Sequence, residues 1–444
     1  MDARADDAAP VTARLGAFAA EMPADGIPRP TRAMMRLSLF DWAVCGIAGR
    51  DEPVARITRG LALADGGAAE ASVIGAGPRL PVRAAALVNG ATSHALDYDD
   101  THFAHIGHPS VAVIPAALAL AERTGADGAA LLDAALVGVE ASVRVGVWLG
   151  RGHYQTGFHQ TATAGTFGAA AAAARLLGLD AGRAAHALGL AATRAAGLKS
   201  QFGTMGKPYN AGIAAQSGTE AALLAAAGFV STPEGIEGEQ GFGPTHAGAA
   251  DPAGLAGLGT DWLFDGISHK FHACCHGTHA MLEALGEIAG QGVAPGGVAA
   301  VTVTTHPRWL RVCNQPAPRT GLEAKFSYRL TAAMALAGRD TGALDTFGDR
   351  AASDPALVAL RDKVTVETDE TLPETAARVS VWLSDGQRLE AAHDLAAPMR
   401  LETRQAKLRA KGAALLGAEG AERLWSAVTA GDVAALAELL RQPA

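Results

Sequence analysis

One short stretch of the chain holds most of the side chains that could do chemistry. It runs SHALDYDDTHFAHIGHPS from Ser93 to Ser110 and contains three carboxylates and four histidines in 18 residues. A buried ionisable group needs a partner or a shifted pKa, so these side chains cannot all be buried at low cost. The stretch is typical of an active-site wall, and a solvated connection between helices is the plainer alternative.

A divalent metal is a further alternative for this stretch, because carboxylates and imidazoles bind Mn, Fe or Zn. The sequence contains no HExxH motif, and the adjacent Cys274 and Cys275 lack the CxxC spacing of a structural zinc site or an iron–sulfur cluster. We therefore expect neither a metal nor any other cofactor.

Three further segments add imidazole and ammonium groups. His159 precedes an Ala-rich helical window, where the positive end of the helix dipole disfavours an imidazolium and favours a neutral base. Lys207 stands at a helix entry, where it can pair with an anion or remain a solvated surface residue. Lys270 lies at the junction between two segments of different composition, and substrate clefts are common at such junctions.

Nucleotide-binding loops are absent from the sequence. The Gly-Lys pair at 206–207 is not a P-loop, because Gln201 and Pro208 occupy the places of its first Gly and its Ser/Thr. Gly75 and Gly77 are not followed by the third Gly of a dinucleotide fingerprint. The carboxylates, imidazoles and lysines that remain suit proton transfer on a small anionic molecule. Lysines would neutralise the carboxylates of such a molecule and make the adjacent C–H more acidic. One carboxylate or His would remove the proton, and another His would protonate the leaving group.

Composition limits the class of protein. The 444 residues are 49% hydrophobic and 18% charged, which excludes a disordered or collagen-like chain. The formal charge of −8 without a basic run argues against nucleic acid and against an acidic membrane surface as partners. Four cysteines are too few for a secreted disulfide framework, the acidic start is no signal peptide, and no apolar run reaches the ~20 residues of a membrane helix. We expect a cytoplasmic protein.

Periodicity predicts helices through the first half of the chain. A stripe from Met34 to Ile47 follows a plausible N-cap at Thr31, and Asp127 and Asp180 each precede a helical window. Because aromatic residues make up only 5%, we expect these helices to pack closely through Ala and Gly. The other helical windows are 111–123, 129–149, 161–177, 182–196 and 211–227.

The residue composition and the periodicity of apolar residues change after a Gly- and Pro-rich loop at 231–252. Alternating, β-branched runs predict strands, and Ser384-Asp385-Gly386 between two of them predicts a hairpin. The predicted strands are 299–305, 363–367, 377–383 and 387–392, with helices at 278–290 and 324–337, then 401–416 and 418–440. The fold class is therefore mostly α: a large discontinuous all-helical domain (1–268 and 397–444) and a smaller α+β lid domain (269–396).

The sequence resembles the MmgE/PrpD family. The resemblance rests on motifs that run in order over nearly the whole chain: NGATSHALDYDDT from Asn89, HPS from His108, GFH from Gly157, LGLD from Leu177, GKP from Gly206 and AKFS from Ala324. The family includes 2-methylcitrate dehydratase, cis-aconitate decarboxylase and iminodisuccinate epimerase. It implies a homodimer and a metal-independent site between a helical domain and a lid.

Carried over motif by motif, the resemblance implies catalytic roles for six residues: Asp97, Thr101, His108, His159, Lys207 and Lys270. Substrate contacts are expected from four more: Asp100, Tyr154, Ser200 and His279. The sequence departs after Lys270, since relatives often have an aromatic-Pro pair before a Cys. Decarboxylase relatives have a histidine near Cys275; its absence at that point, with His276 one place on, weakens the decarboxylase assignment without excluding it.

The leading expectation is a cofactor-independent lyase of the 2-methylcitrate dehydratase type, acting on a small di- or tricarboxylic acid by removal of an α-proton. Epimerisation of the iminodisuccinate type and decarboxylation of the cis-aconitate type remain alternatives, because one base and several carboxylate-binding cations serve all three reactions. A polyanion-binding protein is the alternative outside the enzyme class.

Overall fold

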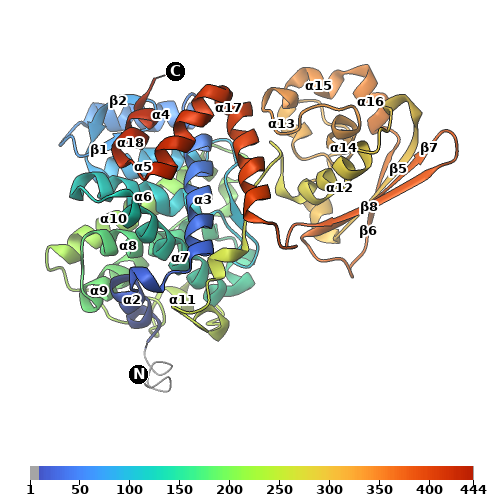
Figure 1. The fold of residues 1–444 in the computed structure, drawn as a ribbon. Helices are drawn as coiled ribbons and strands as arrows, with labels where there is room; N and C mark the ends of the chain where they lie inside the picture. Colours follow the sequence, from blue (N-terminus) through green and yellow to red (C-terminus); the bar gives the residue numbers. More distant parts are fainter. Residues whose placement is uncertain (1–9, 444) are drawn as a thin grey trace. The chain divides into compact units, whose positions relative to one another are not determined.

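The computed structural model describes residues 10–443 (Figure 1). Contacts between residues divide the chain into two compact units, and both chain ends belong to the same one. The first unit takes residues up to 269 and from 416 onward, and the second takes 270–415. This matches the mostly helical fold with a smaller α+β part that the sequence predicts.

The first unit is built from helices. Its longest are α7 and α10, and α17 enters it through its second half. The α-helices are α2 (Val11–Glu21), α3 (Arg29–Ala48), α4 (Pro53–Asp65), α5 (Val82–Ser93), α6 (Pro109–Thr124), α7 (Gly128–Thr156), α8 (Gln160–Leu176), α9 (Ala181–Ala192), α10 (Gly206–Ala226), α11 (Phe242–Thr245), α17 (Leu401–Ala430) and α18 (Val433–Arg441).

Small residues let the central helices of this unit approach closely, as the composition predicts. The Ala run of α8 is buried throughout. Where α8 meets α7, a methyl group on Gly168 would lie 2.5 Å from the carbonyl oxygen of Gly138; where α10 meets α8, one on Gly218 would lie 2.5 Å from the amide nitrogen of Ala170. Side chains at these points would push the backbones apart, so the contacts require glycine.

Aspartates begin two of these helices as expected. The side chain of Asp127 accepts a hydrogen bond from the amide of Ala130, and Asp180 does the same for Arg183, both at 2.8 Å. The N-cap predicted at Thr31 is wrong. Helix α3 begins two residues earlier, after Pro28, and Thr31 instead donates to Asp265 at 3.0 Å.

Two short strand pairs complete the first unit. Strands β1 (Ala71–Val73) and β2 (Ala76–Leu80) form a hairpin, and β3 (Thr101–His102) pairs antiparallel with β4 (Ile267–Ser268). The β3–β4 pair joins the polar stretch of the sequence to the last residues of the unit's first segment. Two-residue strands leave no periodic signal, and the sequence does not predict them.

The second unit contains a four-stranded sheet in the order β6-β5-β7-β8. Strands β5 (Val298–Thr305) and β6 (Val364–Thr368) run parallel, while β7 (Ala376–Leu383) is antiparallel to β5 and to β8 (Arg388–Asp394). The Asp-Gly turn joins β7 to β8 as predicted. The helices are α12 (His279–Ala289), α13 (Gly321–Ala324), α14 (Tyr328–Leu336), α15 (Asp349–Ser353) and α16 (Pro355–Arg361) (Figure 1).

Two boundaries differ from the sequence prediction. The single helix predicted at 324–337 is interrupted, and the hydroxyl of Ser327 caps α14 by accepting from the amide of Leu330. The division after the second unit falls at 415 instead of 396. One contact between the first half of α17 and the second unit is the ion pair of Lys407 with Glu283 on α12, at 2.5 Å. Helix α17 then bends at Gly417, whose φ of 75° is left-handed.

No helix within residues 10–443 combines the length and the apolar character needed to cross a membrane.

Candidate active site

The polar stretch lies between the end of α5 and the start of α6, in the first unit. Its loop is held at two places. Thr101 and His102 pair with β4, and the amides of His102 and Ile106 donate to the carbonyls of Gly107 and His102. The backbone therefore presents residues 94–100 and 108 from a fixed frame.

Asp99 joins two imidazoles at the centre of this loop. Its two carboxylate oxygens each accept a hydrogen bond at 2.8 Å, one from Nδ1 of His94 and one from Nδ1 of His108. Burial alone would raise the pKa of Asp99, but the two imidazoles outweigh it and hold that pKa well below its usual value. Asp99 is therefore an ionised, buried carboxylate that orients both rings.

Asp97 and Lys207 form an ion pair beside this group. The ammonium of Lys207, from the first turn of α10, lies 2.6 Å from one oxygen of Asp97, and Nε2 of His108 lies 3.5 Å from the other. Asp97 has a φ of 52°, in the left-handed region that few residues other than glycine adopt. The Asp97 side chain is 38% exposed and that of Lys207 is 17% exposed, so solvent reaches this pair more easily than it reaches Asp99.

His159 approaches the group from the N-cap of α8. Its ring stacks 6.1 Å from that of His94, and its Nδ1 lies 3.2 Å from the side-chain amide nitrogen of Asn210. Burial first, and then the charges of His94 and Lys207, lower its pKa well below the usual value. The ring is therefore neutral, as the helix start suggests from the sequence.

Asp100 does not present its carboxylate to solvent. It is fully buried, accepts a hydrogen bond from the hydroxyl of Ser110 at 2.5 Å, and its pKa rises to about 8, chiefly through burial. The sequence analysis expects a substrate contact from Asp100. In the structure this carboxyl is instead buried beneath the loop, where it stays protonated near neutral pH.

Two of the four histidines in the stretch are also buried beneath the loop. His102 donates from Nε2 to the carbonyl of Leu263 at 2.7 Å, and burial lowers its pKa to about 4. His105 is completely buried against Gly107 and Gly146, and burial lowers its pKa to about 3. The two histidines of the stretch that hydrogen-bond to a carboxylate are thus His94 and His108.

Four side chains of this cluster could also hold a metal ion. One ligand atom from each of His94, Asp97, Asp99 and His108 falls within 4.8 Å of all the others. Their donor types suit Zn, Mn or Fe. The ammonium of Lys207 already pairs with the Asp97 carboxylate and would compete with a metal ion for it. The metal-independent site expected from the sequence remains a prediction.

The other predicted site residues lie in different surroundings. Thr101 begins β3, next to the cluster in sequence, and Ser200 is exposed in a short 3₁₀ helix. Tyr154, near the end of α7, has the ammonium of Lys199 3.8 Å from the centre of its ring.

Lys270 and His279 belong to the second unit. Lys270 is buried at the first residue of that unit. His279 begins α12, with its ring 4.7 Å from that of His276, and burial followed by the charge of His276 lowers its pKa well below the usual value. The cluster of the first unit thus unites four of the six predicted catalytic residues: Asp97, His108, His159 and Lys207.

Three residues of this cluster are not among the site residues predicted from the sequence. His94 and Asp99 lie inside the polar stretch, but spacing alone does not separate them from His102, His105 and Asp100. Asn210 follows Lys207 by three residues, which on a helix places both on one side. That spacing is the signal that could have found it.

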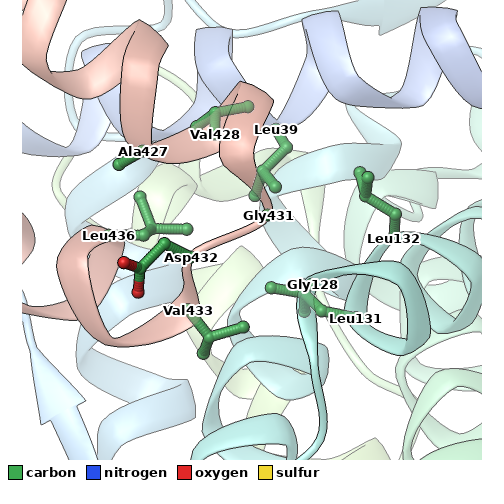
Figure 2. Close-up of a pocket in the computed structure, with 10 residues that line it drawn as sticks. All are labelled: Leu39, Gly128, Leu131, Leu132, Ala427, Val428, Gly431, Asp432, Val433 and Leu436. Carbon is green, nitrogen blue, oxygen red and sulfur yellow. The ribbon is translucent and has the colours of Figure 1, made fainter.

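A hollow in the first unit is apolar, and none of the residues of the cluster lines it. It contains about 210 Å³ of space, part of it open to solvent, between α3, α7 and the C-terminal helices (Figure 2). The carboxylate of Asp432 at its edge caps α18 by accepting from Ala435. The hollow therefore offers no cation to a carboxylate ligand.

Comparison with known proteins gives a consistent result. The sequence model of the MmgE/PrpD N-terminal domain matches residues 13–254, and that of the MmgE/PrpD C-terminal domain matches residues 272–431. The cis-aconitate decarboxylase-like protein oryM of Aspergillus oryzae is 30% identical over 418 residues, 86% of this chain and 85% of that protein. Human cis-aconitate decarboxylase is 30% identical over 369 residues, 78% of this chain and 76% of that protein.

Proposed function

The chain belongs to the MmgE/PrpD family, and on that premise we propose that it is a lyase that removes the proton next to a carboxylate of a small di- or tricarboxylic acid. The observation that carries the proposal is the His108–Asp99 pair set beside the Asp97–Lys207 ion pair. Dehydration of the 2-methylcitrate type is our first candidate reaction.

His108 is the base in this proposal. Its Nδ1–H donates to Asp99, so the lone pair of the neutral ring is on Nε2, which lies on the side of Asp97. When Nε2 takes a proton from carbon, the ionised Asp99 stabilises the resulting imidazolium and keeps the ring in place.

His159 is the hydrogen-bond donor. Because the amide of Asn210 donates to Nδ1, the neutral ring carries its hydrogen on Nε2. That hydrogen can be given to a departing hydroxide or to a developing enolate oxygen. The sequence expectation of a neutral His159 is kept, but its role changes from base to donor.

Lys207 supplies the charge that binds a substrate carboxylate. In the structure its ammonium pairs with Asp97. The ammonium neutralises a substrate carboxylate and stabilises the negative charge that builds up on its oxygens as the adjacent carbon loses its proton, which makes that C–H more acidic. We assign the same role to Lys270, on the family resemblance.

Decarboxylation is the second candidate. It is favoured by the relatives, since five cis-aconitate decarboxylases or decarboxylase-like proteins match this chain. The histidine of the decarboxylase relatives is displaced by one place here, to His276 after Cys275, which weakens this candidate without excluding it. The same cluster would protonate the carbanion that loss of CO₂ leaves.

Proton NMR in D₂O on 2-methylcitrate, citrate, cis-aconitate and iminodisuccinate tests the proposal. Dehydration of 2-methylcitrate converts its methyl doublet into an allylic methyl signal, and dehydration of citrate gives a vinyl proton. Decarboxylation of cis-aconitate releases CO₂, and deuterium entry without net reaction indicates epimerisation. His108→Gln should lower the rate at least ~10²-fold, whereas His393→Gln, on β8, should not. No exchange and no product on any acid would refute the proposed proton transfer.

The family resemblance also implies a homodimer, which we propose for this chain. Light scattering of the purified protein at several concentrations tests it, and a constant monomer mass would contradict it.

A further inference from the structure

Three thiols gather in the second unit, and two of them face each other. Cys313 donates from its Sγ to the Sγ of Cys275 at 2.9 Å. Cys274, although adjacent in sequence, has its Sγ 3.1 Å from the hydroxyl of Thr278. A disulfide bond is about 2.05 Å long, so the Cys275–Cys313 pair needs an approach of less than about 1 Å to become bonded.

The backbones of both cysteines are fixed to the same short segment at the start of α14. The amide of Cys275 donates to the carbonyl of Lys325 at 2.9 Å, and the amide of Tyr328 donates to the carbonyl of Cys313 at 3.0 Å. The hydroxyl of Tyr328 also donates to the carbonyl of Gly277 at 2.6 Å. These hydrogen bonds therefore hold the two sulfurs near each other, although the two cysteines lie 38 residues apart in sequence.

The two thiols differ in access. Cys313 has no exposed surface, and burial followed by the neighbouring Cys275 raises its pKa well above the usual value. Cys275 is only partly buried. A small oxidant therefore reaches Cys275 first, and Cys313 is the thiol that completes the reaction.

We propose that Cys275 and Cys313 are a redox modification site that a hydroperoxide converts reversibly into an intramolecular disulfide. Cys275 Sγ attacks the peroxide, the O–O bond breaks, and Cys275 becomes a sulfenic acid while the peroxide leaves as water or an alcohol. Cys313 Sγ then attacks the sulfenic sulfur, its proton passes to the departing hydroxide, and a second water leaves. Two thiols lose two electrons and the peroxide gains them; a dithiol reverses the step by exchange.

The site adjoins a residue that the proposed function uses. Cys275 follows Lys270 by five residues in one connected segment, and the positive charge of Lys270 acts on Cys274 and Cys313. Disulfide formation would fix this segment to Cys313. An effect on turnover rests on the proposed function, whereas the disulfide itself does not.

The test uses the full chain with about tenfold excess of hydrogen peroxide, followed by alkylation in denaturant and digestion without reductant. Titratable thiols should fall from four to two per chain and return to four after dithiothreitol. Mass spectrometry should find the peptide that begins at Phe271 linked to the peptide that begins at Val312. Turnover of the oxidised and reduced chain is measured separately, so a failure of the proposed function is distinguished from a failure of the redox site.

Variants separate the possible outcomes. Cys274→Ser is the matched control and should form the link as the native chain does. Cys275→Ser, at the partly exposed position, should abolish it while circular dichroism shows an intact fold. A link between Cys274 and Cys275, a Cys275 sulfinic acid with Cys313 still reduced, or four unchanged thiols would each overturn the proposal.

Discussion

Replacement of Asp99 by Asn tests the central element of the site. The carboxylate is buried, ionised and shared between Nδ1 of His94 and Nδ1 of His108 at 2.8 Å. An amide keeps the shape but removes the charge, and its single oxygen can accept from only one of the two rings. The other ring then faces an N–H donor and must change its tautomer or turn.

The expected loss can be worked from these contacts. A hydrogen bond to a charged partner contributes roughly 1.5–3 kcal/mol, and 3 kcal/mol corresponds to about 10²-fold in rate. The wrong tautomer at His108 removes the lone pair from Nε2 and adds to this loss, as it does in Ser-His-Asp triads, where the same change costs about 10⁴-fold. We therefore expect kcat/KM of Asp99→Asn to fall by about 10²- to 10⁴-fold.

The neighbouring Asp100→Asn is the matched control for this measurement. Asp100 is equally buried, but its carboxyl is protonated near neutral pH, so an amide resembles the group already present. Its kcat/KM should stay within about tenfold of the native value, by the same reasoning on neutral hydrogen bonds. Kinetics on whichever acid the NMR panel identifies, with circular dichroism of each variant, provide the assay. A folded Asp99→Asn that keeps more than a tenth of native kcat/KM, or an equal loss in Asp100→Asn, would refute the assignment.

Four further outcomes are expected. Lys207→Met should lower kcat/KM at least ~10²-fold by removing the charge 2.6 Å from Asp97; near-native kinetics would return Lys207 to a structural role. Prolonged chelation should leave activity intact, and loss of activity restored by added Zn²⁺, Mn²⁺ or Fe²⁺ would instead assign a metal to the cluster of two histidines and two aspartates. The pKa of Asp100 in the folded chain, about 8, lies above its unfolded value, so the native state holds an extra proton and stability should fall as pH rises from about 4 to 8. In thermal melts, Asp100→Asn should remove this contribution to the dependence of melting temperature on pH. An identical pH dependence in the native chain and the variant would contradict the buried acid. Burial would raise the pKa of Glu283, but His272 and Lys407 outweigh it and hold that pKa at about 2. The contribution of Glu283 to stability is therefore complete above its unfolded pKa and is lost as pH falls toward 2. Glu283→Gln should lower the melting temperature at pH 7 but not at pH 2, and an equal effect at both would argue against the ion pair.

The helices and strands with regular periodicity were predictable from the sequence, because burial of one face repeats at a fixed interval. Helices α6 and α8 and the β7–β8 hairpin are confirmed close to their predicted bounds, whereas α7 ends at Thr156 instead of 149 and α10 begins at Gly206 instead of 211. Elements set by single distant contacts were not predictable. Thr31 contacts Asp265, which lies far along the chain, and does not cap α3. The first half of α17 contacts the second unit through Lys407 and Glu283, which are also far apart in sequence.

For the site, the sequence by itself determined the kinds of groups and the segments that carry them: the polar stretch, the histidine before α8 and the lysine at the start of α10. Composition and local pattern are properties of the chain that folding does not change. Only the tertiary structure decided the role of each group. Asp99 and Asp100 are adjacent and chemically identical, yet Asp99 meets two imidazoles and is ionised, while Asp100 meets a serine hydroxyl in a buried frame and keeps its proton. The protonation state of a carboxylate depends on the charges and dipoles around it in space, and distant segments supply those only after the chain has folded.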